Sequence, residues 1–80
     1  MTGMLFVSDG AHRVIIRDLS LNGARLRVEQ PVQAGSDAVL KRKPLFAAGR
    51  IAWCRRGEVG LEFYRPLSLE ELDFSFSIEG

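Results

Sequence analysis

Apolar and polar residues alternate with a period of two along much of the chain. In segments 24–29 (ARLRVE) and 58–64 (EVGLEFY) nearly every second residue is apolar. This alternation is typical of a β-strand that places one face on a core. Segment 12–19 (HRVIIRDL) is rich in β-branched residues and predicts a strand that pairs with 24–29. Two shorter apolar runs, 5–7 and 38–41, predict further strands.

A longer strand is predicted at 49–56 (GRIAWCRR). Period two puts Ile51 and Trp53 on one face of this strand and Ala52 on the other. We interpret Trp53, like Phe63 in the following strand, as a core residue, because both fall on the apolar phase of their strands.

Clusters of turn-forming residues separate these strands. The pair Asp9–Gly10 indicates a hairpin turn, because glycine readily adopts the positive φ that such turns need. Segments 30–37, 42–44 and 55–58 are interpreted as connections. Five or six short strands at this spacing predict an all-β fold, a small antiparallel barrel whose closure leaves no exposed strand edge.

The pattern changes after Pro66. Ser68 precedes Glu71 by three residues, the spacing of a capping box, in which each side chain bonds the backbone N–H of the other. We therefore predict a short helix over about 68–74, followed by a tail over 75–80. Three apolar residues at this end are expected to cover the barrel or to contact another protein: Phe74, Phe76 and Ile78.

Length and composition indicate one globular domain over 1–80, with the barrel at about 4–65. The hydrophobic fraction of 46% and the charged fraction of 26% are ordinary for such a domain. No apolar run reaches the roughly 18 residues of a membrane helix, and the first ten residues lack the basic region of a signal peptide. The single cysteine, Cys54, cannot form an internal disulfide, which fits a cytoplasmic location.

Charge is unevenly spread although the net charge is only +1. Segment 10–65 holds all 11 Lys and Arg residues against five carboxylates, a surplus of six positive charges, whereas segment 66–80 holds four carboxylates. A basic body suits an anionic partner, such as a nucleotide, a nucleic acid or an acidic protein surface. The alternative is that the strands simply present Arg and Lys to water.

Catalytic chemistry is not expected. The chain has one histidine, His12, and one cysteine, Cys54, so it cannot assemble a Cys/His nucleophile or a typical zinc site. Glu70 and Glu71 are adjacent on the predicted helix and diverge. No glycine-rich phosphate loop is present. We therefore expect a non-catalytic protein without a metal or a cofactor.

Binding chemistry is expected in the segment DLSLNG. Asp18 and Ser20 lie two residues apart, so in an extended strand their side chains leave the same face. A carboxylate and a hydroxyl held side by side can accept hydrogen bonds from the ring N–H and amino groups of a purine. Gly23 allows positive φ and lets a flat ring or a second backbone come close. The alternative interpretation is a turn, which Asp and Ser cap through their own backbone.

The segments RDLSLNGARL, GRIAWC and VGLEF, in this order, resemble a PilZ domain. Asp18, Ser20 and Gly23 meet the Asp/Asn-x-Ser-x-x-Gly motif of that family, and the similarity extends from about Leu5 to the end of the predicted helix. The resemblance implies a six-stranded barrel with a C-terminal helix. It also implies recognition of cyclic di-GMP, a bacterial second messenger, as a ligand, with the motif contacting its sugar and base.

The same resemblance implies an Arg-x-x-x-Arg arm before the first strand that clamps the phosphates. Only four residues precede the first predicted strand, so we expect this arm to be missing. Arg13 and Arg17 have the right spacing, but a strand holds them rigidly, and we interpret the spacing as coincidental. Substitute phosphate contacts are expected from Arg13, Arg17 and Arg25, with further basic residues at Arg27 and 41–43, and binding is expected to be weak.

Two hypotheses follow. In the first, the protein is a signalling or adaptor module that binds cyclic di-GMP through Asp18, Ser20 and Gly23. In the second, a divergent PilZ domain has lost the nucleotide and acts as a protein–protein interaction module. A protein partner is expected in either case. A nucleic-acid partner is not, because no exposed aromatic residue is evident on the basic strands. The sequence leaves open whether the barrel forms a homodimer.

Overall fold

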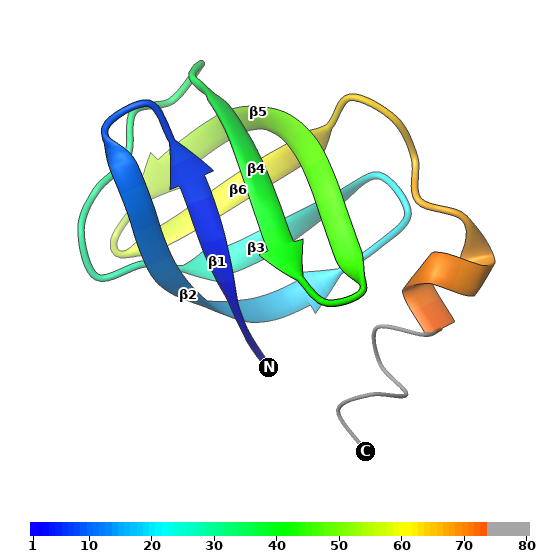
Figure 1. The fold of residues 1–80 in the computed structure, drawn as a ribbon. Coiled ribbons are helices and arrows are strands. Elements are labelled where there is room, and N and C mark those ends of the chain that lie inside the picture. The colour runs from blue at the N-terminus through cyan, green and yellow to red at the C-terminus, as the bar shows by residue number, and fades with distance from the viewer. Residues whose placement is uncertain (74–80) are drawn as a thin grey trace.

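The computed structural model describes residues 1–73 and forms a closed, antiparallel, six-stranded β-barrel (Figure 1). The strands are β1 (Thr2–Val7), β2 (Gly10–Leu19), β3 (Gly23–Arg27), β4 (Asp37–Arg42), β5 (Leu45–Arg55) and β6 (Glu58–Phe63). Around the barrel they follow the order β1-β2-β3-β6-β5-β4. The predicted all-β barrel is therefore confirmed, with β1 and β5 beginning three and four residues earlier than the sequence pattern indicates.

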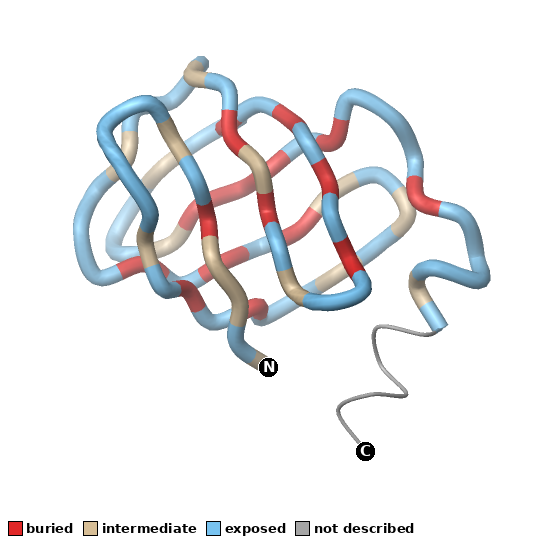
Figure 2. Tube along the Cα trace, viewed as in Figure 1, coloured by how far each residue is buried: buried red, intermediate tan, exposed pale blue. Residues whose placement is uncertain are grey.

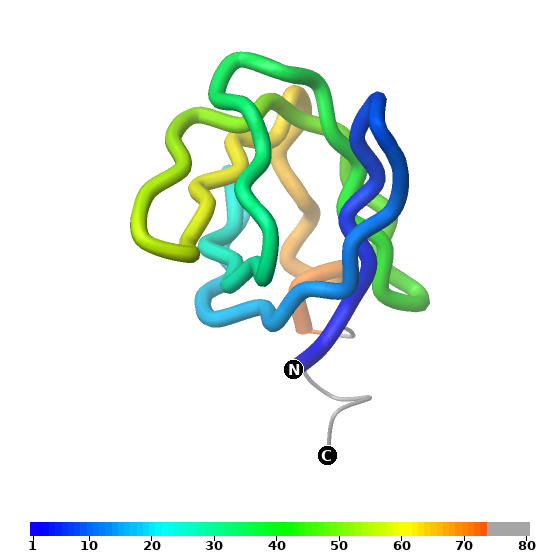
Figure 3. The backbone as a smooth tube through the Cα atoms, turned by 90° about the vertical axis from the view of Figure 1, so that its left-hand side faces the viewer, coloured from blue at the N-terminus to red at the C-terminus, as the bar shows by residue number. Residues whose placement is uncertain are grey.

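The barrel consists of two three-stranded meanders, β1–β2–β3 and β4–β5–β6, whose outer strands pair with each other (Figure 3). β3 pairs with β6 over five residue pairs, including Leu26 with Val59. β1 pairs with β4 over three, including Leu5 with Leu40. These two long-range pairings close the sheet and leave the four named side chains inside.

Buried and exposed residues alternate along much of the strands (Figure 2), and the buried ones form a single core. Leu5, Leu26, Leu40, Ile51 and Val59 are fully buried. Burying such side chains contributes about 1.5–3 kcal/mol each, which is the main source of stability for a domain of this size. Phe63 belongs to the same core, as predicted.

Two β-bulges interrupt the alternation. In β2 the register shifts between Ile16 and Asp18, and in β5 it shifts between Ile51 and Trp53. Each bulge adds one residue to its strand, so the next side chain faces the opposite side from the one that period two predicts. The prediction that Trp53 lies in the core with Ile51 was therefore wrong: Ile51 is buried, and Trp53 is on the outer face and 36% exposed.

After β6 the chain runs along one end of the barrel to a short helix over residues 69–73, which lies at the same end as Met1 (Figures 1 and 3). The backbone N–H of buried Leu67 donates to the carbonyl of Leu21 at 2.7 Å, and Leu72 packs against the core. The predicted tail over 75–80 and the three apolar residues expected to make contacts, Phe74, Phe76 and Ile78, lie outside the described residues. Within residues 1–73 no helix is long and apolar enough to cross a membrane.

Candidate functional site

The outer face of strands β2, β3, β6 and β5, here called the polar wall, holds the predicted motif. Register places Asp18 opposite Arg25, Arg25 opposite Gly60, and Gly60 opposite Trp53. These four residues form one row that crosses the polar wall. Without the bulges in β2 and β5, Asp18 and Trp53 would point into the core instead.

Two further outward rows flank this middle row. The row toward the short helix contains Gly23, Glu62 and Arg50. The row toward the other end contains Ile15, Arg27, Glu58 and Arg55. Since outward residues on a strand lie two positions apart, neighbouring rows are separated by about 7 Å.

Asp18 and Arg25 form an ion pair in the middle row, with Oδ2 3.1 Å from the guanidinium Nη2. Their side chains are 71% and 47% exposed, so solvent screens the attraction. An exposed pair of this kind contributes about 0.2–1 kcal/mol, which is little enough for a ligand to rearrange it.

Ser20 and Gly23 close the turn between β2 and β3. Both the backbone N–H of Ser20, at 2.9 Å, and its hydroxyl, at 3.2 Å, donate to the Gly23 carbonyl. The turn interpretation of this segment is therefore confirmed. It does not exclude a binding role, because the Ser20 hydroxyl is exposed and keeps its two acceptor lone pairs.

Gly23 is required for the close approach of β3 to β6. A Cβ atom at this position would lie 2.4 Å from the carbonyl oxygen of Leu61, which is shorter than any allowed contact. The positive φ considered for Gly23 is not observed, so its role here is to admit a second backbone. The motif glycine thus fixes the position of the Ser20–Gly23 turn on the polar wall.

The three other candidate arginines are placed differently. Arg17 is outward on β2, the bulge turns Asp18 outward next to it, and Arg27 lies outward on β3. Arg13 is also exposed on β2 but lines a separate hollow with Glu29, about 13 Å along the strand from Arg17. The structure therefore brings Arg17 and Arg25 to the motif and leaves Arg13 apart from it.

Sequence reasoning missed one part of the polar wall. Trp53 and Arg55 on β5 and Arg56 in the following turn line a hollow of about 330 Å³ with Arg25, Arg27 and Glu58. The Arg55 guanidinium lies 5.5 Å from the centroid of the Trp53 ring. The signal that could have revealed this arrangement is Gly60, because a glycine inside a strand often marks a close approach of another group.

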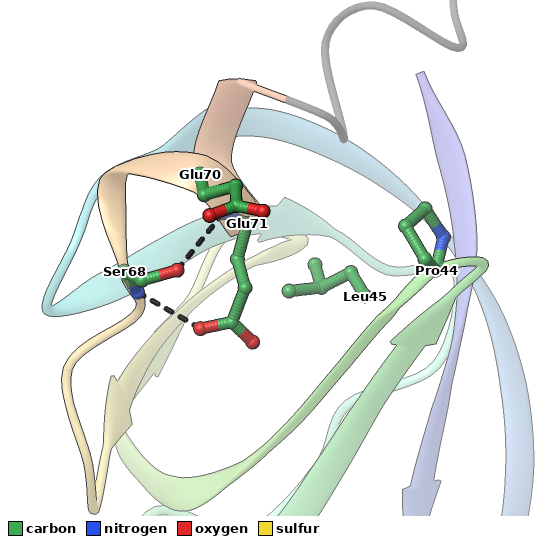
Figure 4. Close-up of a pocket in the computed structure, with 5 residues that line it drawn as sticks. All are labelled: Pro44, Leu45, Ser68, Glu70 and Glu71. Atoms are coloured by element: carbon green, nitrogen blue, oxygen red, sulfur yellow. Dashed lines mark hydrogen bonds between the residues drawn. The ribbon is translucent and has the colours of Figure 1, made fainter.

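A second hollow lies at the barrel end beneath the short helix and has a volume of about 360 Å³ (Figure 4). It is lined by Pro44, Leu45, Ser68, Glu70 and Glu71. Figure 4 shows the reciprocal bonds of the predicted capping box: the backbone N–H of Ser68 donates to Glu71 Oε1 at 2.9 Å, and that of Glu71 donates to Ser68 Oγ at 3.0 Å. With two carboxylates and no basic residue in its lining, this hollow is poorly suited to an anionic ligand.

Metal chemistry has no visible basis in the described part of the chain. Within residues 1–73, no group of three or more His, Cys, Asp or Glu side chains could hold a metal ion. What the polar wall offers is a carboxylate, a hydroxyl and several guanidinium groups on a rigid surface. Hydrogen-bond donors and acceptors of this kind, gathered on the outer face of a closed barrel, suit the class of modules that bind a polar ligand.

The comparison with known families agrees with this class. The family model of the PilZ domain matches residues 1–76, and the chain belongs to the PilZ domain family. PilZ domains are known for cyclic di-GMP binding and signalling, and act as binding or adaptor modules. Searches of curated proteins and of solved structures return no match.

Proposed function

We propose that this domain binds cyclic di-GMP on the polar wall and acts as a non-catalytic signalling or adaptor module. Asp18, Ser20 and Gly23 form the base- and sugar-binding part of the site. Arg25 and Arg17 supply phosphate contacts next to it, with Arg13 as a more distant candidate. The family membership supports the ligand, and the arrangement of the polar wall supports the site.

The observation that carries the proposal is the bulge in β2. It turns Asp18 outward directly after the outward Arg17, and it sets the Asp18 carboxylate 3.1 Å from Arg25 on the neighbouring strand. Asp18, an acceptor for purine N–H groups, therefore lies beside Arg25, a donor for phosphate, and both side chains are exposed. A regular strand would place either Arg17 or Asp18 inward.

Asp18 and Arg25 have enough hydrogen-bonding capacity to bind a ligand without breaking their ion pair. A carboxylate has about four lone-pair sites, so Asp18 can keep Arg25 and accept from a guanine. The Arg25 guanidinium has five N–H donors, of which the contact to Asp18 occupies only part. Hydrogen bonds to charged groups contribute about 1.5–3 kcal/mol each, so two arginine–phosphate contacts would change affinity by two or more orders of magnitude.

The test is an amide-shift NMR titration with cyclic di-GMP at low and at physiological salt, with affinity measured by calorimetry. We expect shifts that cluster on Asp18–Gly23 and on Arg25. Asp18→Asn and Ser20→Ala should each weaken binding about tenfold, and Asp9→Asn, in the β1–β2 turn, is the matched control. Unchanged affinity in both variants, or no shifts up to millimolar ligand, would contradict the proposal.

A second candidate function is protein binding through the opposite side of the barrel. The outer face of β1 and of the start of β5 exposes Phe6 (40%) and Phe46 (64%). Their cross-strand partners on β4 are the partly buried Val39 and the exposed Lys41. Exposed aromatic residues on one sheet face are typical of protein interaction sites.

This alternative predicts that the domain captures a partner protein from its native host without needing the nucleotide. Phe46→Ser should abolish that capture while the barrel stays folded, and Asp18→Asn should leave it unchanged. Capture that survives Phe46→Ser and Phe6→Ser would exclude this face as the contact.

A further inference from the structure

The outer face of β1, β4 and the first half of β5, here called the apolar face, lies on the other side of the barrel from the polar wall. Register aligns Phe6, Val39 and Ala48 across these three strands, and we call them the apolar row. Phe6 is 40% exposed, Ala48 is exposed and Val39 is partly buried. Figure 1 views this face, and no described segment crosses it. A partner that covered the apolar row would remove apolar surface from water.

Opposite charges flank the apolar row on β4. Asp37 lies two residues before Val39 and Lys41 lies two residues after it, so both side chains also point outward, each about 7 Å from the row. The hydroxyl of Tyr64 donates a hydrogen bond to Asp37, which holds this carboxylate at the edge of the face. A carboxylate has about four lone-pair sites, so Asp37 can accept further bonds. Among the described residues, 1–73, Lys41 pairs with no carboxylate.

β5 has a second complementary pair on the two sides of the apolar row. Phe46 is the cross-strand partner of Lys41, and Arg50 is the cross-strand partner of Asp37. Phe46 is 64% exposed and the Arg50 side chain is 52% exposed. A guanidinium group is attracted to the face of an aromatic ring. On both strands, therefore, two groups that attract each other lie at equal distances on opposite sides of the row.

We propose that the apolar face binds a second copy of this chain, with a two-fold axis that runs along the apolar row. A two-fold interface uses the same patch on both protomers, so the patch has to be complementary to itself. Rotation about this axis sets the apolar row of one protomer on that of its partner and exchanges the two flanking rows. Lys41 of each protomer then faces Asp37 of the other, and Phe46 faces Arg50.

The charge pattern disfavours the other two-fold orientation. An axis parallel to the strands would set Lys41 against Lys41 and Asp37 against Asp37, and like charges at an interface are strongly unfavourable. Sheets that pack face to face are about 10 Å apart, a distance that the long Lys41 side chain can cross to reach a carboxylate. A second copy is favoured over an unrelated protein because the face itself provides the matching groups.

The inference rests on the second candidate function for the choice of face, and it names the partner. It does not depend on nucleotide binding. The strand order places β4 opposite β3 in the barrel. The polar walls of the two protomers would therefore face away from the interface, and both would stay open to a ligand.

The test is sedimentation equilibrium of the full chain without nucleotide. The curved face of three strands gives a small interface, so we expect a dimer with a dissociation constant of about 10–100 µM. Lys41→Asp and Asp37→Lys should each weaken self-association about tenfold or more, because each sets like charges against each other twice. Arg27→Asp, on the polar wall, is the charge-matched control. An equimolar mixture of Lys41→Asp and Asp37→Lys should dimerise about as well as the wild type, because every contact then joins an acid and a base.

Recovery in the mixture also shows that both variants are folded. The inference is overturned if the wild type stays monomeric at millimolar concentration, if both single variants associate as well as the wild type, or if the mixture of folded variants stays monomeric. Calorimetry with cyclic di-GMP on the same samples separates the two proposals. A monomer that binds the nucleotide overturns only this inference, and a dimer that does not bind it contradicts only the proposed nucleotide site.

Discussion

Gly60 and Trp53 face each other across β6 and β5, and the indole occupies the space that a side chain at position 60 would fill. Gly60→Ala should therefore displace the indole and lower the free energy of unfolding by about 1–3 kcal/mol. Denaturant unfolding measures the loss, and a red shift of Trp53 emission reports the displacement. In a Trp53→Ala background, Gly60→Ala should lower the free energy of unfolding by much less. An equal loss in both backgrounds would show that Gly60 and Trp53 are not in contact.

Gly23 and Ser20 separate the structural role of the motif from its binding role. Gly23→Ala would force a Cβ against the Leu61 carbonyl oxygen, which belongs to the backbone and cannot easily move. We expect a loss of about 2–3 kcal/mol in the free energy of unfolding. Ser20→Ala removes one exposed side-chain hydrogen bond and should cost no more than about 0.5–1.5 kcal/mol. Equal losses of stability in the two variants would contradict this division.

Arg56 should show a trade-off between stability and binding. Arg56 and Gly57 form the turn between β5 and β6, with φ values of 53° and 78°. Arg56→Asn places a residue that tolerates positive φ in this turn, and we expect it to raise the free energy of unfolding by about 0.5–1 kcal/mol. The same variant removes one positive charge from the hollow that Arg56 lines together with Arg25 and Arg27, so it should bind cyclic di-GMP more weakly. Thermal unfolding and calorimetry on one protein sample test both effects.

The capping box links the short helix to pH. Hydrogen bonds from the backbone N–H and hydroxyl of Ser68 hold the pKa of Glu71 below its ordinary value of 4.5. A lowered folded-state pKa means that this contribution to stability is fully present above pH 4.5 and is lost as the pH falls through the folded-state value. Ser68→Ala should raise the pKa of Glu71, as followed by NMR, and should weaken the helix by about 1 kcal/mol at neutral pH.

Tyr64, the only tyrosine of the chain, donates a hydrogen bond from its hydroxyl to Asp37 Oδ1. This bond, with smaller contributions from burial and from the charge of Asp37, raises the pKa of Tyr64 above 10.0. Its contribution to stability is present below pH 10 and is lost as the pH rises through the folded-state pKa. In the Asp37→Asn variant Tyr64 should lose its proton at a lower pH than in the wild type, as followed by the absorbance of the phenolate at alkaline pH.

Most of the barrel could be predicted from the sequence, because inward-facing residues such as Leu26, Val59 and Leu61 follow period two without interruption. The capping box of Ser68 and Glu71 was equally predictable, since it depends on local spacing. These features require only that neighbouring residues in the chain adopt one regular conformation.

The bulges were not predictable in this way. Neither Arg17 nor Ala52 differs from an ordinary strand residue, and the register shift becomes visible only when the partner strand is in place. One extra residue was enough to move Trp53 from the predicted core to the surface. The sequence pattern indicated no exposed aromatic residue on the basic strands, but the structure places Trp53 there. This changes the interpretation of the whole polar wall.

The pairing of β3 with β6 also makes the polar wall a junction between distant parts of the chain. Asp18 and Arg25 belong to the first meander, and Gly60 and Trp53 belong to the second. A ligand that reaches from Asp18 to Trp53 crosses this junction. Its binding energy would therefore stabilise the pairing of β3 with β6, two strands that are far apart in the sequence. Occupancy by the messenger would then slow the separation of the two meanders, and the lifetime of the folded barrel would itself depend on the messenger concentration.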